Sequence, residues 1–380
     1  MSALFISFHL RRGSSGGAIA ARGFESVSRA VLGGALCSIF QDDVTGEYDA
    51  DGVCVRVSRR SSIAMAWRLV VQGDLGRHRF RFDGRKLAGT SARRVAVVDG
   101  VGHASVLPAL RKEFSPVLVI HQNFEPDYYA DSHEGKWSKR LWVRAGRRAE
   151  ALAACHADFH FFVTREDMGR FQLAFSDTVD SCAVLGVQEE PVPFAMAERP
   201  DDPRIRVLIT GGMGDRKGVV GLLDLLKMVS SERDELLGSF HFIVAGRNPP
   251  PAVKGLADGD LIELHEDVPD IGTIARTCDL YLNPNYTGSG IKVRNLDGLR
   301  NGLSVLCRIE NSAGFRELPG DVFQTFRSTA EGIGLLKAMH LKDLTVEGRR
   351  RKAWQAYVDH FSVEVGARRF RDALAARGWR

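Results

Sequence analysis

The feature that most constrains the fold of this 380-residue chain is a repeated alternation of continuous apolar runs with amphipathic segments. The runs in the first half include ALFISF (3–8), RVAVVDG (94–100), PVLVIHQN (116–123) and DFHFFVT (158–164). Strands that are apolar on both faces belong in a parallel sheet with helices on both sides. The pattern therefore predicts an α/β fold with doubly wound parallel sheets.

The alternation stops once and then begins again. The interruption, VQEEPVPFAMAERPDDPR (187–204), is rich in proline and acid, which is typical of a linker. We expect a Rossmann-like domain over 1–190, a linker over 191–203, a second Rossmann-like domain over 204–345 and terminal helices over 346–380. In such sheets, ligands bind beyond the carboxyl ends of the strands, so the loops after strands are the places to search for a site.

Several classes of protein are disfavoured by the composition. No apolar run reaches about 18 residues, so we expect no transmembrane helix. At the N-terminus, MSALFISFHLRRG has its cations after the apolar run, which is the wrong order for a signal peptide. The six cysteines include no CxxC pair, so a cytoplasmic protein with free thiols is favoured over a disulfide or zinc framework.

Two glycine-rich segments follow strands in the second half. The first, ITGGMGDRKG (209–218), places Gly211 and Gly212 after a strand, with Arg216 and Lys217 leading into a helix. Glycines allow backbone amides to approach a phosphate, and a helix N-terminus adds its dipole. An ordinary glycine-rich turn with a solvated basic pair is the equally favoured alternative.

The second segment, NPNYTGSGIK (283–292), repeats this arrangement. We expect a helix to begin directly after Ser289 and Gly290, with Lys292 and Arg294 in its first turn and Asp297 further along. Cations at a helix start are unfavourable unless an anion is bound there. Two such ends in one domain indicate a nucleotide diphosphate. The alternative is an ordinary helix whose charges face water.

Four segments of the second half, taken in order, resemble a known family of enzymes. ITGGMGDRKG, HFIVAG (241–246), EDVPDIGTIARTCDLYLNP (266–284) and GSGIKVRNLDGLRNGLSVL (288–306) resemble, in sequence and spacing, the donor-binding domain of GT-B glycosyltransferases of the retaining family 4 type. The resemblance spans about 204–339. HFSVEVGARRFRDAL (360–374) is similar to the closing helix of that family, which crosses back to the first domain.

The resemblance implies a GT-B fold, with two Rossmann-like domains facing an interdomain cleft. It implies that Lys217 pairs with the donor diphosphate and that Asp297 accepts hydrogen bonds from the ribose. Ser289, Gly290 and Ile291 would offer backbone amides to the diphosphate, and the turn at Val268 and Asp270 would receive the nucleobase. Together with Gly211, Gly212, Arg216, Lys292 and Arg294, these residues form the predicted donor site.

The first half holds the predicted catalytic and acceptor residues. VLVIHQNFEPDYY (117–129) places His121 and Glu125 at a strand end, where they could assist the acceptor hydroxyl. A histidine at a strand end is as often structural. Other residues predicted at acceptor or cleft positions are Gly16 and Gly17, in the loop expected after the first strand, and Asp99, Thr164 and Glu166.

A basic segment, KWSKRLWVRAGRR (136–148), carries six cations and no acid, and residues 56–94 carry eleven Lys or Arg against two Asp. Cations beside Trp and Leu favour a helix lying in an anionic membrane interface on the cytoplasmic side. The predicted membrane residues are Lys136, Trp137, Arg140, Leu141 and Arg144. A helix packed on the core with a solvated charged face is the alternative.

The leading hypothesis is a glycosyltransferase that moves a sugar, with retention, from a nucleotide-diphosphate donor to a saccharide or lipid-linked saccharide acceptor in cell-surface polysaccharide synthesis. No DxD motif follows one of the apolar strand runs, so we expect neither a metal nor another cofactor. Two alternatives stay open: a nucleic-acid-binding protein that uses the Arg-rich half, although no nucleic-acid module is recognisable, and a non-catalytic relative. Ser289 stands where many relatives carry Glu, which keeps the last one open.

Overall fold

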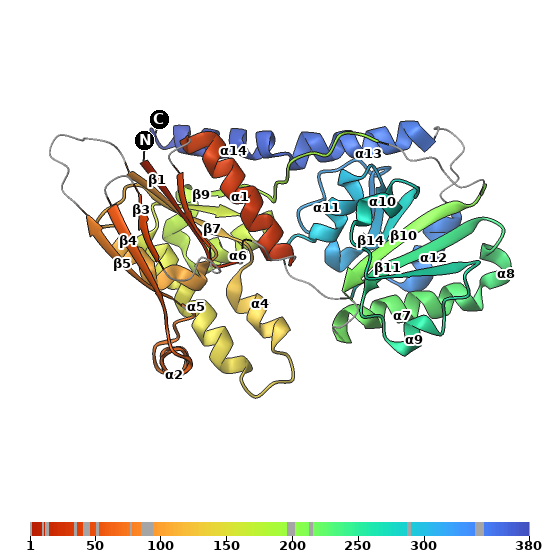
Figure 1. Ribbon diagram of the computed structural model, residues 1–380, viewed down its shortest axis with the longest axis horizontal. Coiled ribbons are helices and arrows are strands. Elements are labelled where there is room, and N and C mark those ends of the chain that lie inside the picture. The colour runs from red at the N-terminus through yellow and green to blue at the C-terminus, as the bar shows by residue number, and fades with distance from the viewer. Residues whose placement is uncertain are drawn as a thin grey trace. The chain divides into compact units, whose positions relative to one another are not determined.

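The computed structural model describes residues 2–9, 11, 15–33, 36–40, 46–50, 53–76, 78–84, 94–195, 202–212, 216–286, 290–338 and 346–379. The chain divides into two compact units (Figure 1). Unit 1 comprises Met1–Glu190 and Val363–Arg380, and unit 2 comprises Pro191–Ser362. Each unit is built around one six-stranded sheet, and every described strand pair in these two sheets is parallel. The doubly wound α/β architecture expected from the sequence is confirmed.

The main sheet of unit 1 has the strand order β2-β1-β6-β7-β8-β9. Its strands are β1 Ser2–Ser7, β2 Leu36–Ile39, β6 Arg94–Asp99, β7 Val117–His121, β8 Phe159–Phe162 and β9 Cys182–Val184. The helices are α1 Gly16–Leu32, α3 Leu107–Leu110, α4 Glu125–Ser132, α5 Lys139–His156, α6 Arg165–Ala174 and α14 Val363–Ala376, with the short turns η2 Val101–Val106 and η3 Ser176–Ser181. The strand order reverses between β1 and β6, and such a switch point is where ligands bind in open parallel sheets.

Helix α14, at the end of the chain, belongs to unit 1 and packs against α1. Two glycines let these helices approach Gln188 closely. An added Cβ at Gly23 would lie 1.8 Å from the backbone oxygen of Gln188, and one at Gly366 would lie 2.5 Å from the Gln188 side chain. The Phe161 and Phe370 rings stack with centroids 4.6 Å apart.

A second, antiparallel sheet lies between β2 and β6 in the sequence. It consists of β3 Gly46–Asp49, β4 Val53–Arg59 and β5 His78–Gly84, in the order β3-β4-β5. Helix α2 (Ser62–Trp67) and the π-helical turn η1 (Arg68–Gln72) connect β4 to β5. Val55 and Val57 of β4 are buried in the core of unit 1, with Phe80 and Phe82 packed beside them. The sequence interpretation did not predict this sheet.

The sheet of unit 2 has the order β12-β11-β10-β13-β14-β15. Its strands are β10 Ile205–Gly212, β11 Phe240–Arg247, β12 Ile262–Glu266, β13 Leu280–Asn283, β14 Ser304–Arg308 and β15 Phe323–Phe326. The helices are α7 Arg216–Ser231, α8 Arg233–Leu236, α9 Pro251–Lys254, α10 Ile271–Ala275, α11 Val293–Arg300, α12 Thr329–Ala338 and α13 Val346–Phe361, with the turn η4 Ile309–Asn311. The order reverses between β10 and β13, so the ends of these two strands define the expected ligand edge.

Three helix starts differ from the sequence expectation. Gly16 and Gly17, expected in a loop, are the first residues of α1, because Ser15 caps the helix by accepting a bond from the Ala18 amide. Helix α11 begins at Val293 rather than directly after Gly290. Helix α5 begins at Lys139, so Lys136 and Trp137 precede it.

No helix in the described parts of the chain combines the length and apolarity needed to cross a bilayer.

Candidate functional site

In unit 2, an arginine lies against the end of the central strand β10. An added Cβ at Gly211 would lie 2.7 Å from Nη1 of Arg294 and 3.1 Å from its Cζ. A side chain at position 211 would have to displace this guanidinium, which is the flexible end of the Arg294 side chain. Arg294 is in the first turn of α11, so α11 places a cation at the strand-order reversal.

Burial raises the pKa of Tyr281 to about 12, against the opposing effect of the Arg294 cation. The Tyr281 hydroxyl lies 2.7 Å from Oγ1 of Thr210, one residue before Gly211. An added Cβ at Gly298 of α11 would lie 2.8 Å from the Tyr281 ring. The neutral phenol therefore fixes α11 against the ends of β10 and β13.

A chain of buried asparagines holds the start of α11. Nδ2 of Asn283, at the end of β13, donates to Oδ1 of Asn295 at 2.8 Å, and Nδ2 of Asn295 donates to the Asn311 carbonyl at 3.0 Å. Asn311 in turn donates to the Asn285 carbonyl at 2.6 Å. Buried amides with partners restrict a loop to one geometry, because an unmade bond is costly. The sequence interpretation missed this network.

The segment before α11 is non-helical. Gly290 has a φ of 65°, a left-handed value that favours glycine, and Lys292 is the extended N-cap residue. The side chain of Ile291 lies 2.9 Å from the position of an added Cβ at Gly314, so Ile291 packs on that loop. The amides of Gly290 and Ile291 therefore precede the helix rather than forming its first turn.

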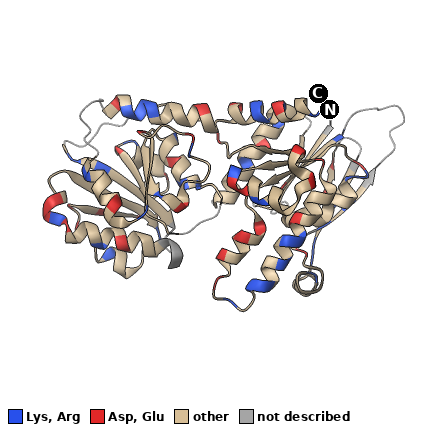
Figure 2. Ribbon diagram, turned by 180° about the vertical axis from the view of Figure 1, so that it is seen from behind, with Lys and Arg blue, Asp and Glu red and all other residues tan. Residues whose placement is uncertain are grey.

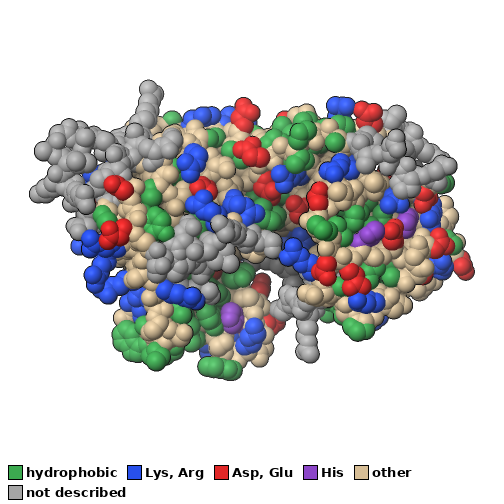
Figure 3. All heavy atoms as spheres, in the orientation of Figure 1, with side chains coloured by type: hydrophobic (Ala, Val, Ile, Leu, Met, Phe, Trp, Pro, Cys, Tyr) green, Lys and Arg blue, Asp and Glu red, His purple; other side chains and the backbone are tan. Residues whose placement is uncertain are grey.

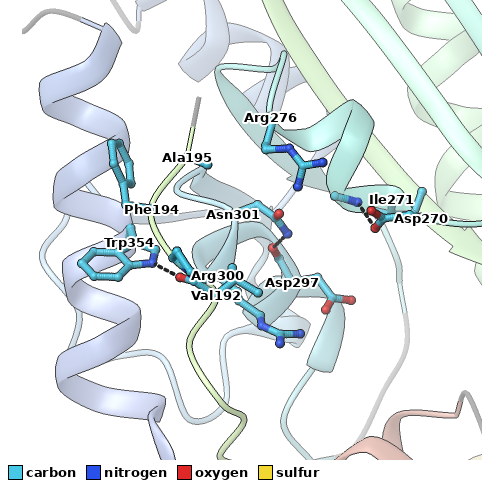
Figure 4. Close-up of a pocket in the computed structure, with 12 residues that line it drawn as sticks. Val192, Phe194, Ala195, Asp270, Ile271, Arg276, Asp297, Arg300, Asn301 and Trp354 are labelled. Carbon is cyan, nitrogen blue, oxygen red and sulfur yellow. Dashed lines mark hydrogen bonds between the residues drawn. The ribbon is translucent and has the colours of Figure 1, made fainter. Parts of the chain in front are cut away.

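A pocket of about 480 Å³ lies within unit 2 (Figure 4). Figure 4 shows Trp354 and Phe194 on one side and Asp270 on the other, with Arg276, Asn301, Asp297 and Arg300 between them. The full lining is Val192, Pro193, Phe194, Ala195, Asp270, Ile271, Gly272, Arg276, Asp297, Arg300, Asn301 and Trp354. Two of these side chains are aromatic and five are polar or charged, so the pocket suits a polar small molecule.

Local hydrogen bonds position the walls of this pocket. Asp270 caps α10 by accepting a bond from the Gly272 amide at 2.8 Å. Asn301 donates from Nδ2 to the Asp297 carbonyl at 2.8 Å. Trp354 of α13 donates from Nε1 to the Val192 carbonyl at 2.8 Å, which ties the chain before β10 to α13.

The structure brings only some of the predicted donor residues together. Asp270 and Asp297 line the pocket, and Gly211 and Arg294 contact each other at the strand end. Val268, between β12 and α10, is half-buried and does not line the pocket. Gly212 is the last residue of β10, and Arg216 and Lys217 are the first residues of α7. The side chains of Arg216 and Lys217, and the whole of Ser289, lie outside the described residues.

Other pocket residues were missed by the sequence interpretation. Arg300 lies three residues after Asp297 on the same helix, a spacing that could have indicated a shared face. Arg276 follows the short helix α10, and only the fold brings Phe194 and Trp354 to this wall. The part of the chain that the structure describes has no group of three or more His, Cys, Asp or Glu arranged to hold a metal ion.

In unit 1, Asp99 ends β6 at the other reversal of strand order. It is fully buried and accepts from Oγ of Ser7 at 2.7 Å and from Nε2 of Gln122 at 2.8 Å. Burial raises the pKa of Asp99, opposed by the nearby His9 and by these two hydrogen bonds. Gly17 admits the His9 ring, since an added Cβ would lie 2.5 Å from His9 Cε1. Asp99 therefore organises the ends of β1, β6 and β7.

His121, the last residue of β7, is only 1% exposed. Its Nδ1 lies 2.9 Å from Oε2 of Glu150, its Nε2 lies 3.1 Å from Nδ1 of His160, and its ring stacks on Phe162 with centroids 4.4 Å apart. Burial lowers the pKa of His121 to about 3. Both ring nitrogens therefore contact protein groups, and the imidazole is neutral at physiological pH.

Two buried carboxyl groups in this region, those of Glu125 and Glu150, have raised pKa values. Burial raises the pKa of Glu125 and of Glu150 to about 8, and in Glu125 the charge of Glu150 adds to this effect. The Glu125 amide donates to Oε1 of Glu150 at 3.0 Å. Such neutral acids in a low-dielectric site are candidates for proton donors or for structural hydrogen bonds.

Thr164 and Asp167 build the start of α6. Thr164 caps the helix by accepting from the Asp167 amide at 3.1 Å, and its hydroxyl donates to Oδ2 of Asp167 at 2.6 Å. Asp167 is buried, and its Oδ1 accepts from the Phe124 amide at 3.3 Å, next to the start of α4. Thr164 thus has a capping role in the fold, while Glu166 is half-buried in the same turn.

The predicted membrane residues are spread over two segments. Trp137 is 94% exposed and Lys136 is exposed, and both precede α5. Arg140 and Arg144 are exposed on α5, whereas Leu141 is half-buried. The expected single helical stripe is therefore not continuous, because α5 begins only at Lys139.

No known family model matches this chain, and no curated protein matches it in sequence. Solved structures do match. HepE of Anabaena in complex with UDP-glucose aligns at 11% identity with a TM-score of 0.61, covering 99% of this chain and 100% of that one. The E. coli structure of trehalose-6-phosphate bound with UDP-2-fluoro glucose aligns at 10% identity and a TM-score of 0.64, covering 98% and 99%.

S. aureus TarM, as a point mutant in complex with fondaparinux, α-GlcNAc-glycerol and UDP, aligns at 9% identity with a TM-score of 0.53. That alignment covers 74% of this chain and only 55% of that one, so the match spans about half of that TarM chain. Together with the two parallel-sheet units, these likenesses show the GT-B fold.

Proposed function

We propose that this chain is a glycosyltransferase that takes a sugar from a nucleotide-diphosphate donor bound in unit 2. The proposal rests on one observation. The guanidinium of Arg294 lies directly against Gly211, where the strand order of the sheet reverses. Similar structures of the same fold were solved with UDP or with UDP-sugars. A cation fixed at the carboxyl edge of a parallel sheet suits a diphosphate.

The pocket beside α11 is proposed to receive the nucleoside. Asp297 would accept hydrogen bonds from the ribose hydroxyls, and Asp270 lies on the wall near the turn proposed for the base. Arg294, with Lys217 and the start of α7, would stabilise the departing diphosphate. Such fixed charges and dipoles stabilise a leaving group electrostatically.

The remaining features of the reaction stay proposals. They include retention at the anomeric carbon, which the family 4 resemblance implies, and turnover without a metal ion or other cofactor. They also include a saccharide or lipid-linked saccharide acceptor, a role in cell-surface polysaccharide synthesis and a place on the inner face of the plasma membrane. Gly16, Gly17 and Asp99 are the proposed acceptor-side residues, and they lie at the strand-order reversal of unit 1.

His121 and Glu125 stay predictions as catalytic groups. Direct proton transfer by His121 needs a ring nitrogen open to the acceptor, but both nitrogens contact Glu150 and His160. The geometry supports a positioning role, in which His121 joins β7 to α5 and β8. Glu125, with its raised pKa, keeps a proton that it could share with an acceptor hydroxyl.

The direct test is a thermal-shift screen against UDP-, GDP-, CDP- and ADP-linked sugars. A ligand at 100 times its dissociation constant stabilises the folded state by about 2.7 kcal/mol. One nucleotide class should raise the melting temperature, and Lys217→Ala should weaken that effect. Stabilisation by RNA alone, with no response to any nucleotide sugar, would favour the nucleic-acid alternative. Donor binding without hydrolysis or transfer would favour the non-catalytic one.

A further inference from the structure

The connection between β4 and β5 presents an apolar face to solvent. In α2 and η1, Ile63 is 83% exposed, Trp67 53%, Val70 54% and Val71 52%. Ile63 and Trp67 lie one turn apart on α2, and Trp67 and Val71 lie about one turn apart across the junction with η1, with Val70 beside Val71, so these side chains share one side of the segment. Single exposed apolar residues are ordinary, but four on one face of a short segment are not. Figure 3 shows apolar side chains gathered over α2.

The segment is anchored, so its exposure is not a sign of poor packing. Leu69, on the opposite face, packs against the core of unit 1. Arg68 forms an ion pair with Asp74, a buried carboxylate that also accepts from the Gly76 amide at 2.8 Å. Gly73, with a left-handed φ of 59°, ends η1 beside α5. The protein therefore holds this apolar face outward.

Cations lie next to this segment. Burial and the neighbouring charges of Arg68 and Arg79 lower the pKa of Arg60, and the nearby Asp74 carboxylate opposes this effect, so three guanidinium groups and one carboxylate lie close together here. Turn η1 contacts α5, and the Arg148 side chain lies 3.2 Å from the position of an added Cβ at Gly73. Figure 2 shows Lys and Arg along α5 beside α2. Segment 136–148 contains six cations and no acid.

We infer that α2 and η1 insert their apolar face into an anionic lipid surface, with the neighbouring arginines on the headgroups. Tryptophan beside aliphatic side chains and cations is the composition of an interfacial helix. Each cation near an anionic leaflet contributes attraction that salt screens.

Other occupants fit less well. A second copy would bring its own arginines against these, and like charges at an interface are unfavourable. Four side chains also present far less than the roughly 800 Å² per partner that a stable protein interface buries. A lipid surface needs neither shape complementarity nor a large area, because binding grows with each inserted side chain.

The inference deepens the proposed function, and it rests on that function only for the lipid-linked acceptor. Helix α2 and η1 would hold unit 1 at the surface where such an acceptor is found. Vesicle binding is measured without any nucleotide sugar, and donor hydrolysis is measured without vesicles. Failure of one therefore does not imply failure of the other.

The test is flotation of the full-length protein with phosphatidylcholine vesicles that contain phosphatidylglycerol, and with phosphatidylcholine alone. The wild type should bind only the anionic vesicles, and added salt should release it. Ile63→Ser combined with Val70→Ser should weaken vesicle affinity at least about tenfold. The matched control is Leu173→Ser, which removes an 89% exposed leucine from α6 of the same unit and should bind normally. Circular dichroism should show all variants folded.

A second measurement identifies the inserted segment. Brominated lipids should quench tryptophan fluorescence in the wild type, and Trp67→Phe should remove more of this quenching than Trp354→Phe, a change in unit 2. Equal vesicle binding by the wild type and the Ile63/Val70 variant would overturn the inference. So would a change of oligomeric state caused by that variant in sedimentation, because it would show that the face joins two copies.

Discussion

The guanidinium of Arg294 occupies the space that a side chain on Gly211 would need, with Nη1 2.7 Å from the position of an added Cβ. The two residues are far apart in the sequence, and the reversal of strand order brings them together. This contact sets the first prediction. Gly211→Ala should displace Arg294 and weaken donor binding about tenfold, or about 1.4 kcal/mol.

The contact also predicts how variants combine. Arg294→Ala should weaken donor binding at least as much as Gly211→Ala, and the double variant should lose less than the sum of the two, because both changes act on one cation. Calorimetric titration with the stabilising nucleotide sugar measures all three. Gly238→Ala is the control, since an added Cβ there meets nothing within 4 Å. Wild-type affinity for the donor in a folded Gly211→Ala protein would show that the position of Arg294 against Gly211 is not needed for donor binding.

Asp297 is predicted to hold the donor through its carboxylate, which lines the pocket. Asp297→Ala should weaken nucleotide-sugar binding about 10- to 100-fold, because a hydrogen bond to a charged group contributes about 1.5–3 kcal/mol. Asp297→Glu, which keeps the carboxylate, should retain more affinity. The control is Asp234→Ala, at an exposed position on α8. Equal affinity of the Ala and Glu variants would show that the carboxylate does not contact the donor.

The buried acids of unit 1 predict a loss of stability with rising pH. The folded-state pKa of Glu125 and of Glu150 is raised to about 8, so the folded protein holds protons that the unfolded chain releases above about 4.3. The contribution of these two groups to the free energy of unfolding therefore falls as pH rises toward 8. The lowered pKa of His121 acts in the opposite direction, but only between about 3 and 6.5.

The clean window for this effect is about pH 7 to 8, where most histidines of the unfolded chain have also lost their proton. Urea unfolding should show a loss of about 1–2 kcal/mol across it. Glu150→Gln should reduce the loss, because glutamine keeps the shape without the proton. A wild-type free energy of unfolding that is flat or rises across this window would contradict the raised pKa values.

Turnover is predicted to survive removal of divalent cations. The departing diphosphate would be stabilised by Arg294, Lys217 and backbone amides, so a divalent ion has no required role. Sugar transfer should proceed equally with EDTA and with added Mg²⁺ or Mn²⁺. Abolition by EDTA, with recovery on adding Mg²⁺ or Mn²⁺, would refute metal independence.

Much of the fold could be predicted because strands buried on both faces are continuous apolar runs in the sequence. Strands β1, β6, β7 and β8, and β10, β11, β13 and β14, coincide with such runs. The antiparallel β3-β4-β5 sheet was missed because its middle strand, VCVRVSR, alternates valine with Cys, Arg or Ser, and the arginines drew the interpretation toward a basic surface. The short edge strands β9 and β15 have too few residues for a periodic signal.

The candidate site was predictable only in part. Asp270 and Asp297 follow strands at motif positions, and both line the pocket. The contact of Arg294 with Gly211 depends on packing between segments that are distant in the sequence. No local sequence pattern reveals such a contact. The same holds for Trp354, which reaches the pocket from α13. His121 illustrates the opposite limit, because a strand-end position does not reveal that its ring is buried.

The most direct test of the central claim is release of nucleoside diphosphate from a panel of nucleotide sugars, measured with the purified full-length protein and a mixture of saccharide acceptors. We expect release from one nucleotide class, at least tenfold slower in Arg294→Ala and Asp297→Ala and unchanged in Asp234→Ala. If no nucleotide sugar binds or turns over, or if both site variants release product at the wild-type rate, unit 2 is not a donor site.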